Sequence, residues 1–387
     1  MTATFTHMDF LIVGQGVAGT FLARTLIERG CRLLVVDDDQ RDSSSRVAAG
    51  LLNPVTGMRL SMAEGTPGLL EKSRQLLSRV TAQHRRPVFT PMPIRRLYES
   101  PEERALKARR AQGREYAGLM ARDDTPGAVS EAIADRHGSF VINGGGWVDL
   151  PLLLDLEAAW LRAQGALASG RVSFADLRPD GTGGGVHWNG LHARKGVIFC
   201  NGYKAGLEPC WSWLPWQPAK GEIIDCDTSV ETLPWILNCG GWAIPLGGGR
   251  WRSGSTWEWR QLDNEPSPEA APALCERLQR FFTPPVRIQP AAHRAGVRPC
   301  VLGNQPFCGT HPQHPWLHLL GGLGPKGTFW GPACAAHLAD WLIDKTPLPS
   351  RFDLIRAWNL AKGGGAGKNP TPQSRKNHGV GKQMEIR

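Results

Sequence analysis

The pattern of apolar and polar positions from Phe10 to Asp37 predicts a buried strand, an amphipathic helix and a second buried strand. The first apolar run, FLIV, ends in a glycine-rich turn, and apolar residues then recur at helical spacing until the second run, LLVVD. The turn has the form G-x-G-x-x-G. This order predicts a dinucleotide-binding unit, which consists of a strand, a glycine-rich turn, a helix and a second strand that ends in an acidic residue.

Each residue type in this unit has a physical role. The first glycine allows a tight turn, the second lets the backbone approach a pyrophosphate, and the third lets helix and strand pack closely. The free N–H groups and the positive end of the helix face the phosphates, and the terminal acid accepts hydrogen bonds from the ribose hydroxyls. The candidate residues are Gly14, Gly16, Val17, Ala18, Gly19, Asp37 and Asp38.

Beyond this unit, helices and strands follow one another up to about residue 216. Leucines at helical spacing predict a helix from about Pro67 to Arg85, proline-bounded strands come next, and the charged stretch from Glu102 to Arg122 predicts a solvent-exposed helix. After Gly144 the pattern predicts a turn, a helix with inward leucines, a short strand in RVSFADL and a stronger strand in GVIFCNGY.

From Pro218 to Arg298 strands alternate with turn residues, which is typical of an antiparallel sheet, and a strand, a glycine loop and a long helix follow. The predicted fold class is α/β, or α+β overall, with a Rossmann-type nucleotide-binding domain interleaved with an antiparallel-sheet substrate domain. The nucleotide-binding segments are 1–88, 148–216 and 300–361, and the substrate-domain segments are 89–147 and 217–299.

The charge balance changes this picture little. The chain has 387 residues and a formal net charge of +10, which invites a nucleic-acid interpretation. Half of that excess lies in residues 362–387, where six basic residues meet one acidic residue in a segment that is almost without apolar positions. We expect a disordered basic tail there. Contact of this tail with an anionic partner such as nucleic acid remains open.

Cysteine usage and the N-terminal pattern favour a cytoplasmic enzyme. The nine cysteines contain no C-x-x-C pair, so reduced thiols are expected rather than disulfides or a zinc site, and the histidines show no metal-ligand spacing. The polar start and short first apolar run are unlike a signal peptide. Nothing elsewhere approaches the length of a membrane-spanning run.

Nine ordered motifs over residues 9–343 carry a resemblance to a known family. They are GQGVAG, VVD, SSSRVAAGLLNP, GGWVDLPLLL, VIFCNGYKA, PAKGE, GSTWE, AGVRP and GGLGPKGTFWGP. In this set the chain resembles the FAD-dependent amine and amino-acid oxidoreductases of the D-amino-acid oxidase and glycine oxidase group. The resemblance implies FAD, bound noncovalently because Cys300 and Cys308 match the family's attachment pattern poorly. NAD is possible from the first motif alone, but the other loops favour flavin.

The resemblance also implies which further residues hold the cofactor. Hydroxyls and a cation in the loop after the second strand meet the pyrophosphate and the flavin edge, small residues line the ring, and a backbone group of the short strand bonds the adenine. A turn lies beneath the cofactor, and the last glycine loop lies by the flavin's pyrimidine end. In chain order these residues are Ser44, Ser45, Arg46, Ala48, Ala49, Gly50, Leu51, Val172, Cys200, Gly202, Gly322, Leu323, Gly324, Lys326, Gly327 and Thr328.

Four residues are implied to act on the substrate. Arg298, in AGVRP, is expected to grip a carboxylate with two parallel bonds beside the cofactor, and Trp242 and Trp257 are expected to line the pocket. Lys326 is a candidate for charge stabilisation, substrate binding or the reaction with oxygen. The chain departs from the family at Pro325, where relatives often carry a second arginine, and at Trp242, where tyrosine is more usual.

Three functions follow as hypotheses. The first is oxidation of a C–N bond in an amino acid or secondary amine to an imine that water hydrolyses, with electrons passing to O2 or another acceptor. The second is an FAD-dependent tRNA-modification enzyme that removes a carboxymethyl group from a modified uridine. The third is a flavin-binding protein without turnover.

Overall fold

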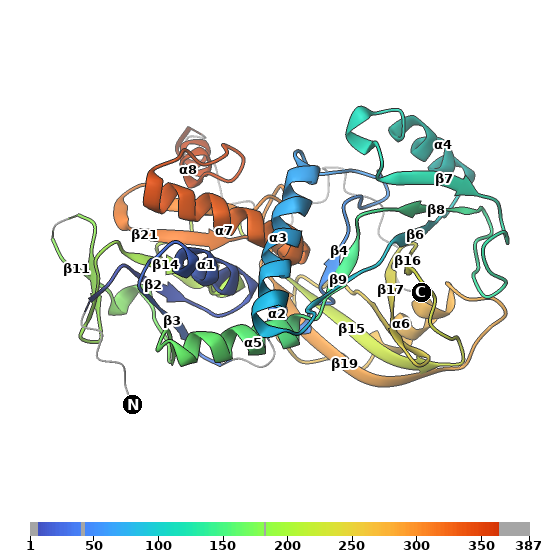
Figure 1. Ribbon diagram of the computed structural model, residues 1–387, viewed down its shortest axis with the longest axis horizontal. Coiled ribbons are helices and arrows are strands. Elements are labelled where there is room, and N and C mark those ends of the chain that lie inside the picture. Colours follow the sequence, from blue (N-terminus) through green and yellow to red (C-terminus); the bar gives the residue numbers. More distant parts are fainter. Residues whose placement is uncertain (1–6, 40–42, 182, 364–387) are drawn as a thin grey trace.

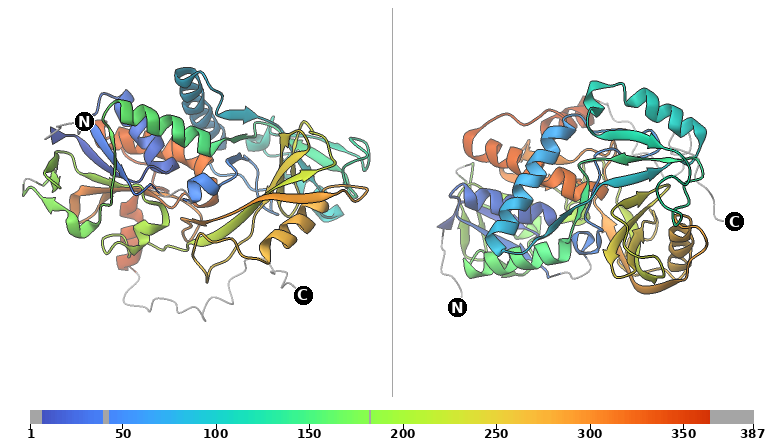
Figure 2. Two further views of the ribbon diagram at one scale, coloured as in Figure 1. Left: turned by 90° about the horizontal axis from the view of Figure 1, so that it is seen from below. Right: turned by 45° about the vertical axis from the view of Figure 1, so that its right-hand side comes forward.

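The computed structural model describes residues 7–39, 43–181 and 183–363, which fold around two large sheets (Figure 1). One sheet is largely parallel and carries helices on its face, and the other is largely antiparallel. Figure 2 shows that the two sheets occupy opposite ends of an elongated molecule. The predicted α/β class with an added antiparallel sheet is confirmed, while the exact domain boundaries stay a prediction.

The nucleotide-binding end is built on a six-stranded sheet. Its strands in spatial order are β10 (Leu167–Ser169), β3 (Leu33–Asp37), β2 (Phe10–Val13), β14 (Val197–Phe199), β21 (His314–Gly321) and β20 (Phe307–His311). The first five are parallel, and β20 pairs antiparallel with β21. Strands far apart in sequence are therefore neighbours, as in a doubly wound sheet.

Four helices pack together on one face of this sheet because their apolar residues form one core with Phe10 and Ile12 of β2. They are α1 (Val17–Glu28), α3 (Thr66–His84), α5 (Leu150–Ala163) and α7 (Gly327–Asp344). The opposite face packs on a second core, which includes Trp211 and Trp316. Helix α8 (Leu354–Gly363) follows α7, and α2 (Ser44–Val47) lies near β19.

The other end is an eight-stranded sheet. In spatial order its strands are β19 (Ile288–Arg298), β15 (Ala219–Thr228), β18 (Arg250–Gly254), β17 (Trp242–Gly247), β16 (Ile236–Asn238), β6 (Ile94–Leu97), β8 (Ser139–Ile142) and β7 (Met120–Asp124). All neighbours are antiparallel except β16 and β6. The long strands β15 and β19 reach toward the nucleotide-binding end (Figure 1).

Smaller elements join the two ends. A three-stranded sheet contains β4 (Leu51–Leu52), β9 (Gly146–Val148) and β5 (Phe89–Pro91), and a four-stranded sheet contains β1 (His7–Met8), β13 (Leu191–Ala193), β12 (Val186–Trp188) and β11 (Arg178–Pro179). The remaining helices are α4 (Pro101–Arg110), α6 (Ala270–Gln279), η1 (Arg114–Tyr116), η2 (Phe174–Asp176), η3 (Gly202–Leu207) and η4 (Gly324–Lys326).

Three element predictions are wrong. The expected helix from Glu102 to Arg122 stops at Arg110, and its last residues belong to β7. Helix α6 lies in a region read as strands only; its apolar stripe is short, with Leu274 and Leu278 buried. Val172 lies in no strand, because Ser173 and Asp176 form a capping box that turns the chain into η2.

No helix in the described ranges is long and apolar enough to span a membrane. The nine cysteines are free thiols, as expected. The predicted basic tail lies, from residue 364 onward, outside the described residues; its first two positions end α8.

Removing the N-cap of α5 should lower stability modestly. Asp149 accepts a hydrogen bond from the backbone N–H of Leu152 at 3.1 Å. Asp149→Ala should therefore cost about 1 kcal/mol of unfolding free energy, measured by urea titration. Asp149→Asn, which retains an accepting oxygen, is the control and should lose little; equal losses in the two variants would contradict the capping role.

Candidate active site

The glycine-rich turn holds the start of α1 against its neighbours. Gly14 has φ +101°, and a Cβ on Gly19 would lie 1.9 Å from the Gly14 carbonyl oxygen. A Cβ on Gly16 would lie 2.9 Å from Ser45 Oγ. Gly14 and Gly19 are therefore required by close backbone approach, as the sequence predicted for Gly19, while the atom nearest Gly16 is a side-chain hydroxyl.

The two aspartates at the end of β3 are held by different partners. Asp37 accepts hydrogen bonds from the backbone N–H of Gln15 at 2.6 Å and of Asp39 at 2.9 Å, so its carboxylate is fixed beside the glycine-rich turn. Asp38 pairs with Lys204 at 2.9 Å. This pair ties the end of β3 to η3. The role of Asp37 toward a ribose stays a prediction.

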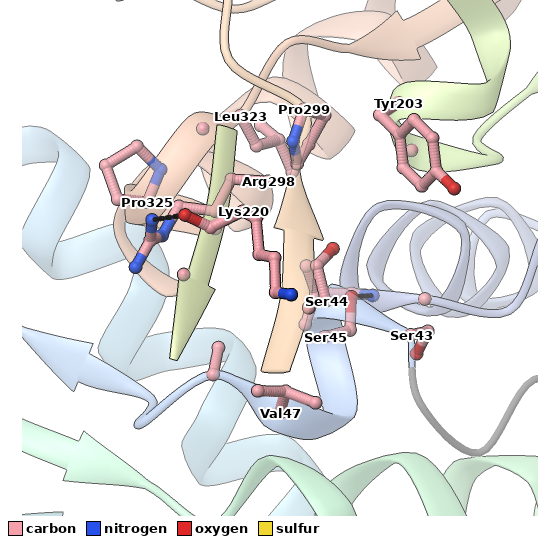
Figure 3. Close-up of a pocket in the computed structure, with 18 of the residues that line it drawn as sticks. Ser43, Ser44, Ser45, Val47, Tyr203, Lys220, Arg298, Pro299, Leu323 and Pro325 are labelled. Atoms are coloured by element: carbon pink, nitrogen blue, oxygen red, sulfur yellow. Dashed lines mark hydrogen bonds between the residues drawn. The ribbon is translucent and has the colours of Figure 1, made fainter. Parts of the chain in front are cut away.

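The loop and short helix after β3 approach the start of α1. Ser45 Oγ accepts a hydrogen bond from the backbone N–H of Val17 at 3.1 Å, and Arg46 donates to Asp155 at 2.7 Å. Figure 3 shows Ser44 and Ser45 on the wall of the cavity. Ser45 and Arg46 therefore join α2 to α1 and α5, and their contacts with a phosphate stay a prediction.

The small residues that follow pass between β9 and α7. Gly50 has φ +70°, and a Cβ on it would lie 1.9 Å from the Val148 carbonyl oxygen. Thr328 Oγ1 donates to the Leu51 carbonyl at 3.1 Å. The backbone of this loop is thus fixed from both sides, with Ala48 and Ala49 on the cavity wall.

The turn after β14 contains a residue that the sequence reasoning passed over. Asn201 lines the cavity, and its Oδ1 is buried without a hydrogen-bond partner. Such an atom is costly unless a ligand or a water molecule donates a hydrogen bond to it. Cys200 beside it is buried, and burial raises the pKa of its thiol, so the thiolate is disfavoured there. Val172 also lines the cavity, although it is not in a strand.

The last glycine loop leads into α7 at the cavity. Lys326 Nζ donates to Thr56 Oγ1 at 2.8 Å, and burial lowers the pKa of this lysine. The side chain is half-buried. Gly322 is not on the cavity wall; a Cβ there would meet Val301 at 3.0 Å, so its role is packing.

Arg298, at the end of β19, is a cation without an acidic partner. Its Nη1 donates to the carbonyls of Lys220 at 3.3 Å and Thr256 at 3.2 Å, and its guanidinium lies 4.5 Å from the ring centroid of Trp257 (Figure 3 shows Arg298 beside Lys220). Among the residues the structure describes, no carboxylate lies within ion-pair distance of it. Burial lowers its pKa to about 10.

Gly221 makes room for this guanidinium. A Cβ on Gly221, in the neighbouring strand β15, would lie 1.8 Å from Arg298 Nη2. The motif PAKGE therefore contributes to the site through a glycine that sequence reasoning did not assign. Gly221 comes close to Arg298 because β15 pairs with β19 in a register that sets Gly221 opposite Gly296, two residues before Arg298.

One cavity of about 1640 Å³ joins these parts. It is bounded by the C-terminal ends of β2 and β3 on one side and by β15, β17 and β19 on the other, and Trp242 and Trp257 line it. Every predicted site residue contributes to its wall except Gly19 and Gly322. This volume exceeds the roughly 300–1,000 Å³ of a single drug-sized pocket, which suits a cofactor plus a substrate.

The residues present fit FAD. The glycine-rich turn and the start of α1 suit a pyrophosphate, Asp37 suits a ribose, and the unpartnered Asn201 Oδ1 offers an acceptor beneath the cofactor. Neither Cys300 nor Cys308 is on the cavity wall. Noncovalent attachment stays a prediction.

A family model described as "FAD dependent oxidoreductase" (DAO) matches residues 9–341. The bifunctional tRNA 5-methylaminomethyl-2-thiouridine biosynthesis protein MnmC of Azoarcus sp. is 24% identical over 400 aligned residues, covering 91% of this chain and 59% of that protein. Glycine oxidase of Pseudomonas aeruginosa is 32% identical over 143 residues, covering 37% of this chain and 39% of that protein. The chain thus spans less than two thirds of both relatives in these matches.

The fold is shared with solved structures. Glycine oxidase from Geobacillus kaustophilus superposes with a TM-score of 0.76 at 22% identity, covering 88% of this chain and 96% of that one. This likeness supports the fold.

Proposed function

Because the chain belongs to the DAO family of FAD-dependent oxidoreductases, we propose that it oxidises the C–N bond of an amino acid or secondary amine that carries a carboxylate. The observation that carries this proposal is Arg298, a half-buried guanidinium on the cavity wall without an acidic partner in the described structure. A carboxylate is the ligand that a planar guanidinium binds with two parallel hydrogen bonds.

The protein's own contribution is orientation. Arg298 fixes the carboxylate and, through it, the carbon that bears the nitrogen, while Trp242 and Trp257 bound the space around the rest of the substrate. FAD supplies the acceptor for the hydride that leaves this carbon. With FAD bound, the substrate would give up this hydride from carbon and a proton from nitrogen and become an imine, which water would split into a carbonyl compound and either ammonia or an amine. O2 or another acceptor would then take the two electrons.

The test is an anaerobic titration of the purified holoenzyme. The amine panel includes glycine, sarcosine, proline, D- and L-amino acids and bulkier N-substituted glycines, and the visible flavin bands report reduction. Bleaching by carboxylate-bearing amines, and not by the matching amines without a carboxylate, is the expected result. A flavin that every carboxylate-bearing amine leaves oxidised would overturn the proposal.

Lys326 should make the rate of flavin reduction fall at alkaline pH, which gives the pH–rate profile an alkaline limb. Its lowered pKa means that it loses its proton below the ordinary value of 10.5, so a positive charge at the start of α7 is present at low pH and lost as pH rises. We expect the rate of flavin reduction to fall across that transition. Lys326→Met should remove the limb and slow reduction at neutral pH. An unchanged limb in this variant would assign it to another group.

A second candidate, the tRNA-modification enzyme, is favoured by one surface feature. Trp257 and Trp259 are 44% and 50% exposed, line the cavity and lie 6.0 Å apart with their rings 28° from parallel. Exposed aromatic rings of this kind are platforms on which bases stack. An electrophoretic shift with tRNA that Trp259→Ala weakens would support it, and the absence of any shift would contradict it.

A further inference from the structure

A second arginine faces the same cavity from the substrate side. Arg277 is carried by α6 and lines the cavity. Its Nη1 donates to the Ser255 carbonyl at 2.8 Å. That bond engages one of the five N–H donors of a guanidinium. No carboxylate of the described residues lies within ion-pair distance of it, and burial, with Arg280 adding to the effect, lowers its pKa.

The two arginines are close because they bind successive carbonyls. Arg277 bonds the carbonyl of Ser255 and Arg298 that of Thr256. Successive carbonyl oxygens in one chain lie within about 5 Å of each other, so the two Nη1 atoms are at most roughly 11 Å apart. One small molecule can therefore contact both.

Each arginine is seated on a glycine. A Cβ on Gly241 would lie 2.7 Å from Arg277 Cδ, as a Cβ on Gly221 would lie 1.8 Å from Arg298 Nη2. The backbone thus leaves a defined space for both side chains. Arg277 is therefore a half-buried side chain that packs against Gly241.

On the substrate side of the cavity, Glu99 pairs with Arg96 at 3.8 Å, and the other acids are engaged elsewhere or lie apart. Glu222 bonds the hydroxyl and backbone N–H of Ser267 and pairs with His293. Glu258 accepts a backbone bond from Arg260. Glu269 stands at the first end of α6, eight residues before Arg277. That separation is about 12 Å along a helix. Two like charges with partial desolvation and no counter-charge favour an anion between them.

We propose that the substrate carries a second carboxylate, which Arg277 binds while Arg298 binds the first. This inference rests on the proposed function. The substrate class is then a dicarboxylic amino acid or a secondary amine with two carboxylate arms.

The test compares paired substrates in the holoenzyme. Iminodiacetate against sarcosine and D-aspartate against D-alanine differ mainly in the second carboxylate. We expect the wild-type enzyme to show at least tenfold higher kcat/KM for the dicarboxylate of the productive pair. Arg277→Gln should remove this preference and leave turnover of the monocarboxylate. Arg277→Lys should restore part of it. Arg280→Gln, on the exposed C-terminal side of the same helix, is the matched control and should keep the preference.

The outcomes separate the two proposals. If no carboxylate-bearing amine reduces the flavin, the proposed function fails. If monocarboxylates reduce it but the wild-type enzyme does not prefer dicarboxylates, or Arg277→Gln keeps the preference, only this inference fails. Flavin content and melting temperature show whether the variants fold. Should Arg277→Gln not fold, the wild-type comparison alone decides.

Discussion

Replacing Arg298 with alanine should raise KM for a carboxylate-bearing substrate by about tenfold to a hundredfold while FAD stays bound. The change removes charge-assisted hydrogen bonds worth roughly 1.5–3 kcal/mol, and each 1.4 kcal/mol corresponds to about a factor of ten. The guanidinium makes no ion pair within the described structure, so the loss falls mainly on the ligand rather than on the fold. Steady-state kinetics and the flavin absorbance of the purified variant measure both parts.

Two further variants sharpen this result. Arg287→Ala, an exposed arginine just before the same strand, should leave KM unchanged. Gly221→Ala should imitate the loss of Arg298 because its Cβ would occupy the place of the guanidinium. If Arg298→Ala leaves turnover of carboxylate substrates untouched, Arg298 is not the carboxylate clamp.

Gly19→Ala should yield a protein that loses FAD and melts at a markedly lower temperature. The added Cβ would lie 1.9 Å from the Gly14 carbonyl oxygen, a backbone atom, so the clash can be relieved only by moving α1 away from the turn that follows β2. Overpacking costs about 1–3 kcal/mol in general, and we expect the upper end here. Flavin content after purification and a thermal melt with added FAD measure the two effects.

Gly68→Ala is the matched control for this substitution. Gly68 also lies in the first turn of a helix, α3, and nothing lies within 4 Å of the position of its Cβ. It should bind FAD normally and melt at an equal or slightly higher temperature, because alanine favours helices over glycine. Normal FAD content in Gly19→Ala would show that the close packing of α1 on β2 does not govern binding.

A local pattern predicted its element well where the apolar stripe is long. The helix expected from about Pro67 to Arg85 is α3, from Thr66 to His84, because a long apolar stripe specifies a helix by itself. The weaker stripe of α6 and the turn at Val172 were misread. There a capping box and tertiary packing overrode the local pattern.

The sequence by itself determined the dinucleotide-binding unit, since its strand, turn, helix and acid are adjacent in the chain and each part has one physical role. It also determined that one region alternates strands with helices and another alternates strands with turns, which is why one sheet is largely parallel and the other largely antiparallel. Only the tertiary structure decided how the substrate side is built. Gly221 lies beside Arg298, Asn201 has an unpartnered oxygen, and Arg277 and Arg298 bond the successive carbonyls of Ser255 and Thr256. Sheet pairing and helix packing bring these residues together from distant parts of the chain.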